Sequence, residues 1–117
     1  MALARTDLTA VTQIGMASTV AVVTVGGGQT CYVKSIMLHN LDTSGTQNAN
    51  IYVVPNSGGS AGSATTMNQI FNGIVYAQET VMFEPAYPLV LTATGDSIQV
   101  GAGASDVNFL VTGDKES

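Results

Sequence analysis

Basic residues are scarce in this sequence, and that scarcity limits its possible partners. The chain has 117 residues, and its three basic residues, Arg5, Lys34 and Lys115, face eight acidic ones, giving a formal net charge of −5. Affinity for nucleic acids comes largely from cations that contact phosphates, so we expect no nucleic-acid partner. Charged residues make up only 9% of the chain, compared with about 25% in ordinary soluble domains. Such a charge-poor surface favours a structural protein that is covered in an assembly.

Cysteine and histidine each occur once, and tryptophan is absent. A single cysteine, Cys31, cannot form an intrachain disulfide, and we expect it to be a small buried hydrophobe and not a reactive thiol. His39 has no second histidine and no cysteine cluster with which to hold a metal, so we expect no metal and no cofactor. Aromatic residues are only 6% of the chain. We expect the tyrosines to pack in the core and not to form a carbohydrate platform; they are Tyr32, Tyr52, Tyr76 and Tyr87.

Long apolar runs are also missing. No window approaches the ~20 continuous apolar residues that a membrane-spanning helix requires, so we expect no membrane partner. Asp7 and several Thr and Gln residues interrupt any signal-peptide core before the apolar run Val20–Val25. We therefore expect a protein that is made in the cytoplasm and stays soluble or joins an assembly.

Short apolar segments separated by turn residues fill most of the chain. The longest, Thr30–Leu41, is rich in aromatic and β-branched residues, and it predicts a central strand that is buried on both faces or nearly so. Turn signals recur every 8–12 residues, which is typical of an antiparallel sandwich or barrel. We therefore predict an all-β fold, a single antiparallel β-sandwich of about eight strands, either jelly-roll-like or immunoglobulin-like. The other predicted strands are Thr19–Val25, Ala49–Val54, Met67–Tyr76, Thr80–Phe83, Pro88–Ala93, Asp96–Val100 and Asp106–Thr112.

Two segments fall outside this strand pattern. Met1–Gln13 has no clear period, and we predict an extended N-terminal arm at residues 1–13 that a partner orders, followed by a sandwich domain at residues 14–117. Asn56–Thr66 consists almost entirely of Gly, Ser, Ala and Thr, which predicts a flexible, exposed loop.

No motif in the sequence points to catalysis. Gly58–Gly62 matches G-x-S-x-G, but its Ser60 lies in the Gly/Ser loop with no long helix behind it, and His39 precedes it where hydrolases place the histidine later. Gly101-Ala102-Gly103 lacks the third glycine of a dinucleotide-binding loop. Asp96 and Asp106 are best explained as turn residues that accept backbone hydrogen bonds, with a weak calcium site as the alternative. We predict that the protein is not an enzyme.

The order of the strand and turn segments resembles that of the small β-sandwich structural proteins of tailed bacteriophages. The segments are YVKSIMLHN, NIYVVPNSGGSAG, a QET turn, PLVLTATGDSIQV and VNFLVTGD, and together they cover about Thr19–Asp114. The resemblance implies a virion structural protein, and within that class a head decoration (cement) protein that binds the outer capsid surface between capsomers. A neck, tail, baseplate or receptor-binding fibre component is the alternative.

The resemblance also implies partners. Decoration proteins of this kind are usually homotrimers on the major capsid protein, at the capsid surface of a virion assembled in the host bacterial cytoplasm. We expect an arm that reaches a neighbour, and a Lys34 that points out at the sandwich edge or toward a neighbouring subunit's acid. The candidate partner-binding residues are therefore Leu3, Arg5, Leu8, Val11 and Lys34.

Overall fold

The structure is a computed structural model that describes residues 3–7, 12–14, 19–102 and 107–116. Of residues 3–7 and 12–14 it describes the backbone alone. The described part contains one 3₁₀ turn, η1 at Thr66–Asn68, and ten strands. The strands are β1 Leu3–Asp7, β2 Thr12–Ile14, β3 Thr19–Thr24, β4 Thr30–Asn40, β5 Gln47–Val54, β6 Gln69–Val75, β7 Thr80–Phe83, β8 Leu89–Leu91, β9 Ser97–Ala102 and β10 Val107–Glu116.

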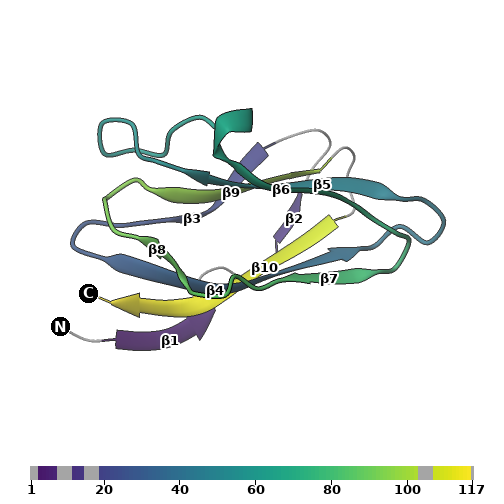
Figure 1. The fold of residues 1–117 in the computed structure, drawn as a ribbon, viewed down its shortest axis with the longest axis horizontal. Coiled ribbons are helices and arrows are strands. Elements are labelled where there is room, and N and C mark those ends of the chain that lie inside the picture. The colour runs from purple at the N-terminus through teal and green to yellow at the C-terminus, as the bar shows by residue number, and fades with distance from the viewer. Residues whose placement is uncertain (1–2, 8–11, 15–18, 103–106, 117) are drawn as a thin grey trace.

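The ten strands form a sandwich of two antiparallel sheets, which confirms the predicted fold class (Figure 1). One sheet has the order β1-β10-β4-β7, with β2 also beside β10 and β8 also beside β4; the other has the order β3-β9-β5-β6. All eight strands predicted from the sequence are present as β3 to β10. They form because β-branched and aromatic residues alternate between turn signals at the spacing that two packed sheets require.

The strand order decides between the two sandwich types that the sequence left open. The chain pairs with itself in nested fashion, β1 and β2 with β10, β3 with β9, β4 with β7 and β8, and β5 with β6. This long hairpin is rolled up so that β10 also lies beside β4, and β9 beside β5. That arrangement is a jelly roll, and the immunoglobulin-like order is therefore wrong.

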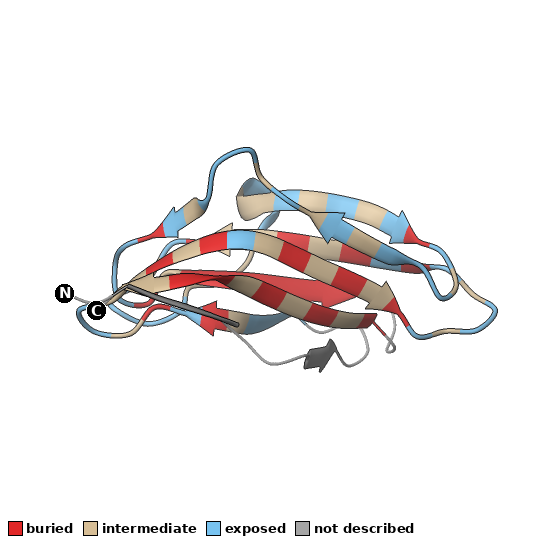
Figure 2. Ribbon diagram, turned by 90° about the horizontal axis from the view of Figure 1, so that it is seen from below, coloured by how far each residue is buried: buried red, intermediate tan, exposed pale blue. Residues whose placement is uncertain are grey.

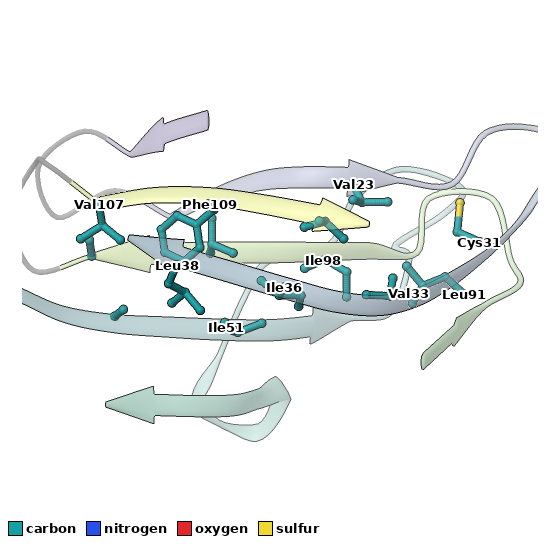
Figure 3. Close-up of a cluster of buried hydrophobic side chains, with 14 of the residues drawn as sticks. Val23, Cys31, Val33, Ile36, Leu38, Ile51, Leu91, Ile98, Val107 and Phe109 are labelled. Carbon is teal, nitrogen blue, oxygen red and sulfur yellow. The ribbon is translucent and has the colours of Figure 1, made fainter. Parts of the chain in front are cut away.

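The core lies between the two sheets and is purely hydrophobic at its centre (Figure 3). Ile36 and Leu38 on β4 lie beside Val111 and Phe109 on β10, and all four side chains are fully buried. The inner face of the opposite sheet is formed by fully buried side chains, among them Ile51, Ile98 and Val100. Burying one such side chain contributes about 1.5–3 kcal/mol, so this core can stabilise the domain without a disulfide.

Strand β4 is central, as predicted, but only one of its faces is fully buried. β10 lies on one side of it, and β7 and β8 on the other. Along most of the strand buried residues alternate with half-buried ones such as Tyr32, Met37 and His39. The strand was predicted to be buried on both faces or nearly so, but its second face is mostly half-buried, because an antiparallel sheet in a two-layer sandwich has one outer face.

A β-bulge interrupts the alternation in the middle of β4. Opposite β10, Ser35 pairs with Thr112 and Val33 pairs with Gly113, so Lys34 is the extra residue. The bulge explains why Val33 and Ile36, three residues apart, are both buried. Lys34 is thereby turned out of the core, and its side chain is about half exposed.

The N-terminal segment differs from the predicted arm. Leu3–Asp7 pairs along its whole length with β10, with Leu3 opposite Glu116 and Asp7 opposite Thr112. Thr12–Ile14 pairs with the other end of β10. No strand was predicted here, because mixed composition hides a strand whose pairing partner lies at the far end of the chain. The domain boundary at residue 13 stays a prediction.

The loop between β5 and β6 is exposed, as predicted, but hydrogen bonds hold its shape. Ser57 and Ser60 exchange two backbone hydrogen bonds of 2.8 and 3.2 Å. Gln99 on β9 donates from Nε2 to the carbonyl of Gly62 at 2.8 Å, which ties the loop to the outer face of its own sheet. These hydrogen bonds give part of the segment a defined shape that the prediction of a flexible loop did not include.

Candidate assembly surface

The structure places the three residues of possible catalytic chemistry, Cys31, His39 and Ser60, in three separate local environments. Cys31 is buried in the core, and burial raises the pKa of its thiol, which keeps it a poor nucleophile. His39 lies on β4 with Nδ1 2.8 Å from the Thr80 hydroxyl on the neighbouring strand β7. Ser60 takes part in the small turn with Ser57. In the described part of the chain no hydrogen bond joins Ser60 to His39.

The described aspartates at turns act as expected of turn residues. Asp96 Oδ1 accepts from the backbone and side-chain N–H groups of Asn56, at 2.9 and 3.0 Å, and Oδ2 accepts from the Ala93 N–H at 3.1 Å. These hydrogen bonds, those from Asn56 first, lower the pKa of Asp96. Asp42 accepts from the backbone N–H groups of Ser44 and Gly45, which lowers its pKa too. Asp106 lies outside the described residues.

Among residues 3–7, 12–14, 19–102 and 107–116, no group of three or more His, Cys, Asp or Glu side chains is arranged to hold a metal ion. None of the helical segments in the described chain has the length and hydropathy needed to cross a bilayer.

A small open pocket lies on the outer face of the larger sheet, around the one internal lysine. It encloses about 170 Å³ and is lined by Tyr32, Lys34, Pro88, Asp114 and Glu116. Lys34 Nζ lies 2.7 Å from Asp114 Oδ2, and the Tyr32 hydroxyl donates to Glu116 Oε1 at 3.2 Å. The hydrogen bond to Glu116 is the main reason why the pKa of Tyr32 is raised.

One of the five predicted partner-binding residues lines this pocket, and the backbone positions of two others are paired with residues that line it. Lys34 lines it, and the register of β1 on β10 places Leu3 opposite Glu116 and Arg5 opposite Asp114. The acid that Lys34 contacts belongs to its own chain, so the predicted contact with a neighbouring subunit's acid is not needed to explain its position. Leu8 and Val11 lie outside the described residues.

Large exposed apolar side chains occur elsewhere, along the edge strands β6, β7 and β8 and the segments beside them. Those of β6 lie on the outer face of the smaller sheet, and those of β7 and β8 lie on the outer face of the larger one. We call this surface the β6–β8 edge. Figure 2 shows mostly exposed and intermediate residues on the strands of one long side, next to strands that are banded with buried residues. The large exposed hydrophobic residues of the β6–β8 edge are Met67, Ile70, Ile74, Tyr76, Met82, Tyr87 and Val90.

An aromatic contact joins the two sheets along this edge. The rings of Phe71 on β6 and Phe83 on β7 meet edge-to-face, with centroids 6.1 Å apart. Tyr76 and Tyr87 lie outside this contact and are 63% and 84% exposed. The prediction that the tyrosines pack in the core is therefore wrong for these two residues, and the half-buried Tyr32 and Tyr52 are not part of the core cluster either.

The sequence itself carries a signal for this surface. From Met67 to Val90 the only charged residues are Glu79 and Glu84. In β6 both alternating sets are apolar, with Phe71 and Val75 in one and Ile70 and Ile74 in the other. A strand that is apolar on both faces, without charge, marks either a fully buried strand or an exposed apolar edge. Only the sheet order distinguishes these two alternatives. It places β6 at the end of its sheet, so the strand is an exposed edge and not a fully buried strand.

Comparisons with known proteins complete the description. No protein-family model and no curated protein matches the sequence. Among solved structures, the chain is similar to a chain in the structure of infectious bursal disease virus Gx strain, with 9% identity and a TM-score of 0.43 over 97% of this chain. It is also similar to a chain of the crystal structure of the infectious bursal disease virus VP2 subviral particle, with 10% identity and a TM-score of 0.36 over 97% of this chain. It spans 32% and 31% of the length of those two chains. At these identities and TM-scores the likenesses bear on neither the function nor the partners of this chain.

Proposed function

We propose that this chain is a virion structural protein, and that it is a head decoration protein which binds the outer capsid surface between capsomers. The β6–β8 edge is the observation that carries the proposal. An exposed apolar edge beside nearly uncharged strands promotes aggregation of a free monomer. In a protein that is covered in an assembly, the same edge can be buried and stabilise the contact. On this proposal the chain has no catalytic role.

Three further features support the proposal. The jelly-roll strand order is one that viral capsid proteins use, although lectins and cupins share it, so the fold by itself names no function. The order of strand and turn segments resembles that of small phage structural proteins. Charged residues make up only 9% of the chain, which leaves much of its surface suited to contact with other subunits.

The proposed partners are further copies of this chain and the major capsid protein. Junctions between capsomers have three-fold or quasi-three-fold symmetry, which favours a homotrimer. Several weak contacts then act together, because the first contact raises the effective concentration of the others. Within the β6–β8 edge, Tyr87 and Val90 are the residues proposed to touch the capsid, since both are large, apolar and more than half exposed.

The proposal is tested by adding the protein back to particles that lack it. The purified chain should bind undecorated heads, and cryo-electron microscopy should place it at junctions between capsomers. Tyr87→Ser and Val90→Ser together should weaken binding, whereas Val20→Ser, at an exposed apolar residue of β3, should not. Density for the protein only in the neck or tail of complete particles would contradict a decoration role.

A neck, tail, baseplate or receptor-binding component is the second candidate. The two exposed tyrosines favour it, because a tyrosine presents both an apolar ring and a hydroxyl to a ligand. The isolated protein should then bind host cells, and Tyr76→Ser with Tyr87→Ser should abolish that binding. A decoration protein should not bind cells specifically, so this assay separates the two candidates.

A further inference from the structure

Strand β6 ends its sheet, and no strand pairs with its outer side in the part of the chain that the structure describes. An edge strand presents a row of backbone N–H and C=O groups that another extended strand can pair with. Proteins usually protect such edges with lysine, proline or inward-pointing charges. β6 has the sequence QIFNGIV and contains none of these residues.

One protective feature is present, but it covers only the start of the strand. A register shift against β5 makes Ile70 an extra residue between Gln69 and Phe71. Phe71–Val75 follows in regular pairing with β5. Ile74 is 61% exposed, and Asn72 is exposed as well. The regular part of the edge therefore carries an exposed apolar side chain and no charge.

We propose that β6 pairs antiparallel with β6 of a second copy of this chain, around a two-fold axis at Asn72. An antiparallel pair of identical strands must have such an axis, and the residue on the axis faces its own copy. With Asn72 on the axis, Ile74 of one copy lies beside Ile70 of the other. This register brings the two exposed isoleucines of each strand onto those of its partner.

The choice of a second copy as the partner follows from this self-complementarity. The hydrogen-bonding groups of one β6 edge match those of another, and an uncharged strand meets no like-charge repulsion when it faces itself. Cross-strand apolar pairs of this kind stabilise the pairing of two strands. The other end of the same sheet, β3, is also uncharged, but a β3–β6 contact would be head-to-tail and would build rings or filaments.

This contact uses Ile70 and Ile74 of the β6–β8 edge, whereas Tyr87 and Val90 are the residues proposed to touch the capsid, so different substitutions test the two contacts. The β6 contact has two-fold symmetry and closes at two copies, so it is distinct from the three-fold contact of the decoration proposal. If both contacts form and the three β6 edges of one trimer pair with the three of another, the two-fold contact joins two trimers. If only the two-fold contact forms, the protein is a dimer. In either case, loss of the β6 contact should halve the mass of the assembly.

Cysteine substitutions test the register. In the proposed pair the two copies of residue 72 are direct neighbours, so Asn72→Cys should form an intermolecular disulfide under mild oxidation on a non-reducing gel. Ile74→Cys is the matched control, because its two copies would lie four residues apart along the strands, roughly 14 Å, beyond the ~7 Å reach of a disulfide. The wild type, whose one cysteine is buried, should form none.

Charge substitutions at the axis test the contact itself. Asn72→Lys and Asn72→Asp each place like charges opposite each other, and sedimentation velocity should show half the wild-type mass for each variant alone. An equimolar mixture of the two variants should return to the wild-type mass, because lysine then faces aspartate. Asn72 is exposed, so both variants should keep the wild-type circular dichroism spectrum.

Three results would overturn the proposal. The first is an unchanged mass for Asn72→Lys. The second is a disulfide in Ile74→Cys but not in Asn72→Cys. The third is failure of the mixture to recover, which would point to a head-to-tail contact through β3 in place of the two-fold pair.

Discussion

Lys34 Nζ lies 2.7 Å from Asp114 Oδ2, and this ion pair links the bulge of β4 to the end of β10. Asp114 is only 6% exposed, although its neighbours in the outer row of β10 are half-buried. Its other carboxylate oxygen, Oδ1, is buried and has no hydrogen-bond partner among the described residues. Within that part of the chain, Lys34 is therefore the group that compensates a buried negative charge.

Lys34→Met should destabilise the fold by about 1–3 kcal/mol, because it leaves the buried Asp114 carboxylate without its cation. The loss should be at the low end of this range, since the Lys34 side chain is 47% exposed and solvent already screens the pair. Urea denaturation measures the free energy of unfolding. Lys115→Met is the control. Lys115 follows Asp114 on β10 and forms no ion pair within the described residues, so its loss should lower the free energy of unfolding by less. Equal losses would mean that the pair contributes nothing.

Gly95 should tolerate no side chain. Its φ of +93° lies in the left-handed region, and an added Cβ would come within 2.7 Å of the Gly59 carbonyl carbon and 2.8 Å of the Ser60 nitrogen. These are backbone atoms of the β5–β6 loop and cannot rotate away. Gly95→Ala should therefore lower the free energy of unfolding by about 2–4 kcal/mol, from strain and overlap together. A fall in the melting temperature would show this loss.

Two glycine controls separate strain from overlap at that site. Gly58 has a φ of +63° with open space around it, so Gly58→Ala should lose only about 1 kcal/mol from strain. Gly27 has open space and no positive φ, so Gly27→Ala should be close to neutral. If Gly95→Ala cost no more than Gly58→Ala, the close approach of the loop to Gly95 would be refuted.

The sandwich could be predicted because its signals are local. Alternating residues such as Val107, Phe109 and Val111, bounded by Gly and Asp turns, give both the strand and its buried face. The turn role of Asp96 was also predictable, because a short carboxylate at a Gly-containing turn accepts nearby N–H groups.

The candidate surface could not be predicted in the same way, because it depends on which strands meet. Ile74 alternates as a core residue would, but the register of β6 on β5 places it in the outward-facing set, opposite the exposed Asn48. Leu3–Asp7 pairs with residues more than 100 positions away, a relationship that no local pattern records. The partner of Lys34 was missed because a one-residue bulge, invisible in the sequence, sets the direction of its side chain.

Asp96 should make stability depend on pH in acid. Its pKa is lowered in the folded state, so its contribution is fully present above the unfolded-state pKa of about 3.9 and is lost as the pH falls through the folded-state value. Asp96→Asn should lower the free energy of unfolding by roughly 1–2 kcal/mol at pH 7. The difference from wild type should shrink in denaturation series below about pH 4. A difference that stays constant from pH 7 to pH 2 would show that the carboxylate charge is not the stabilising feature.

Deletion of Met1–Thr12 distinguishes an arm from a strand. A free arm could be removed without loss of stability, and only assembly would weaken. In the structure, however, β1 pairs with β10 from Leu3 opposite Glu116 to Asp7 opposite Thr112. The deletion should therefore expose the edge of β10 and lower the melting temperature, and it should also raise amide hydrogen exchange along residues 112–116. Exchange in the core strand β4 should rise less, because β10, β7 and β8 still flank it. If melting temperature and exchange are both unchanged and only assembly is lost, the segment acts as an arm in solution and its pairing with β10 contributes little to the fold.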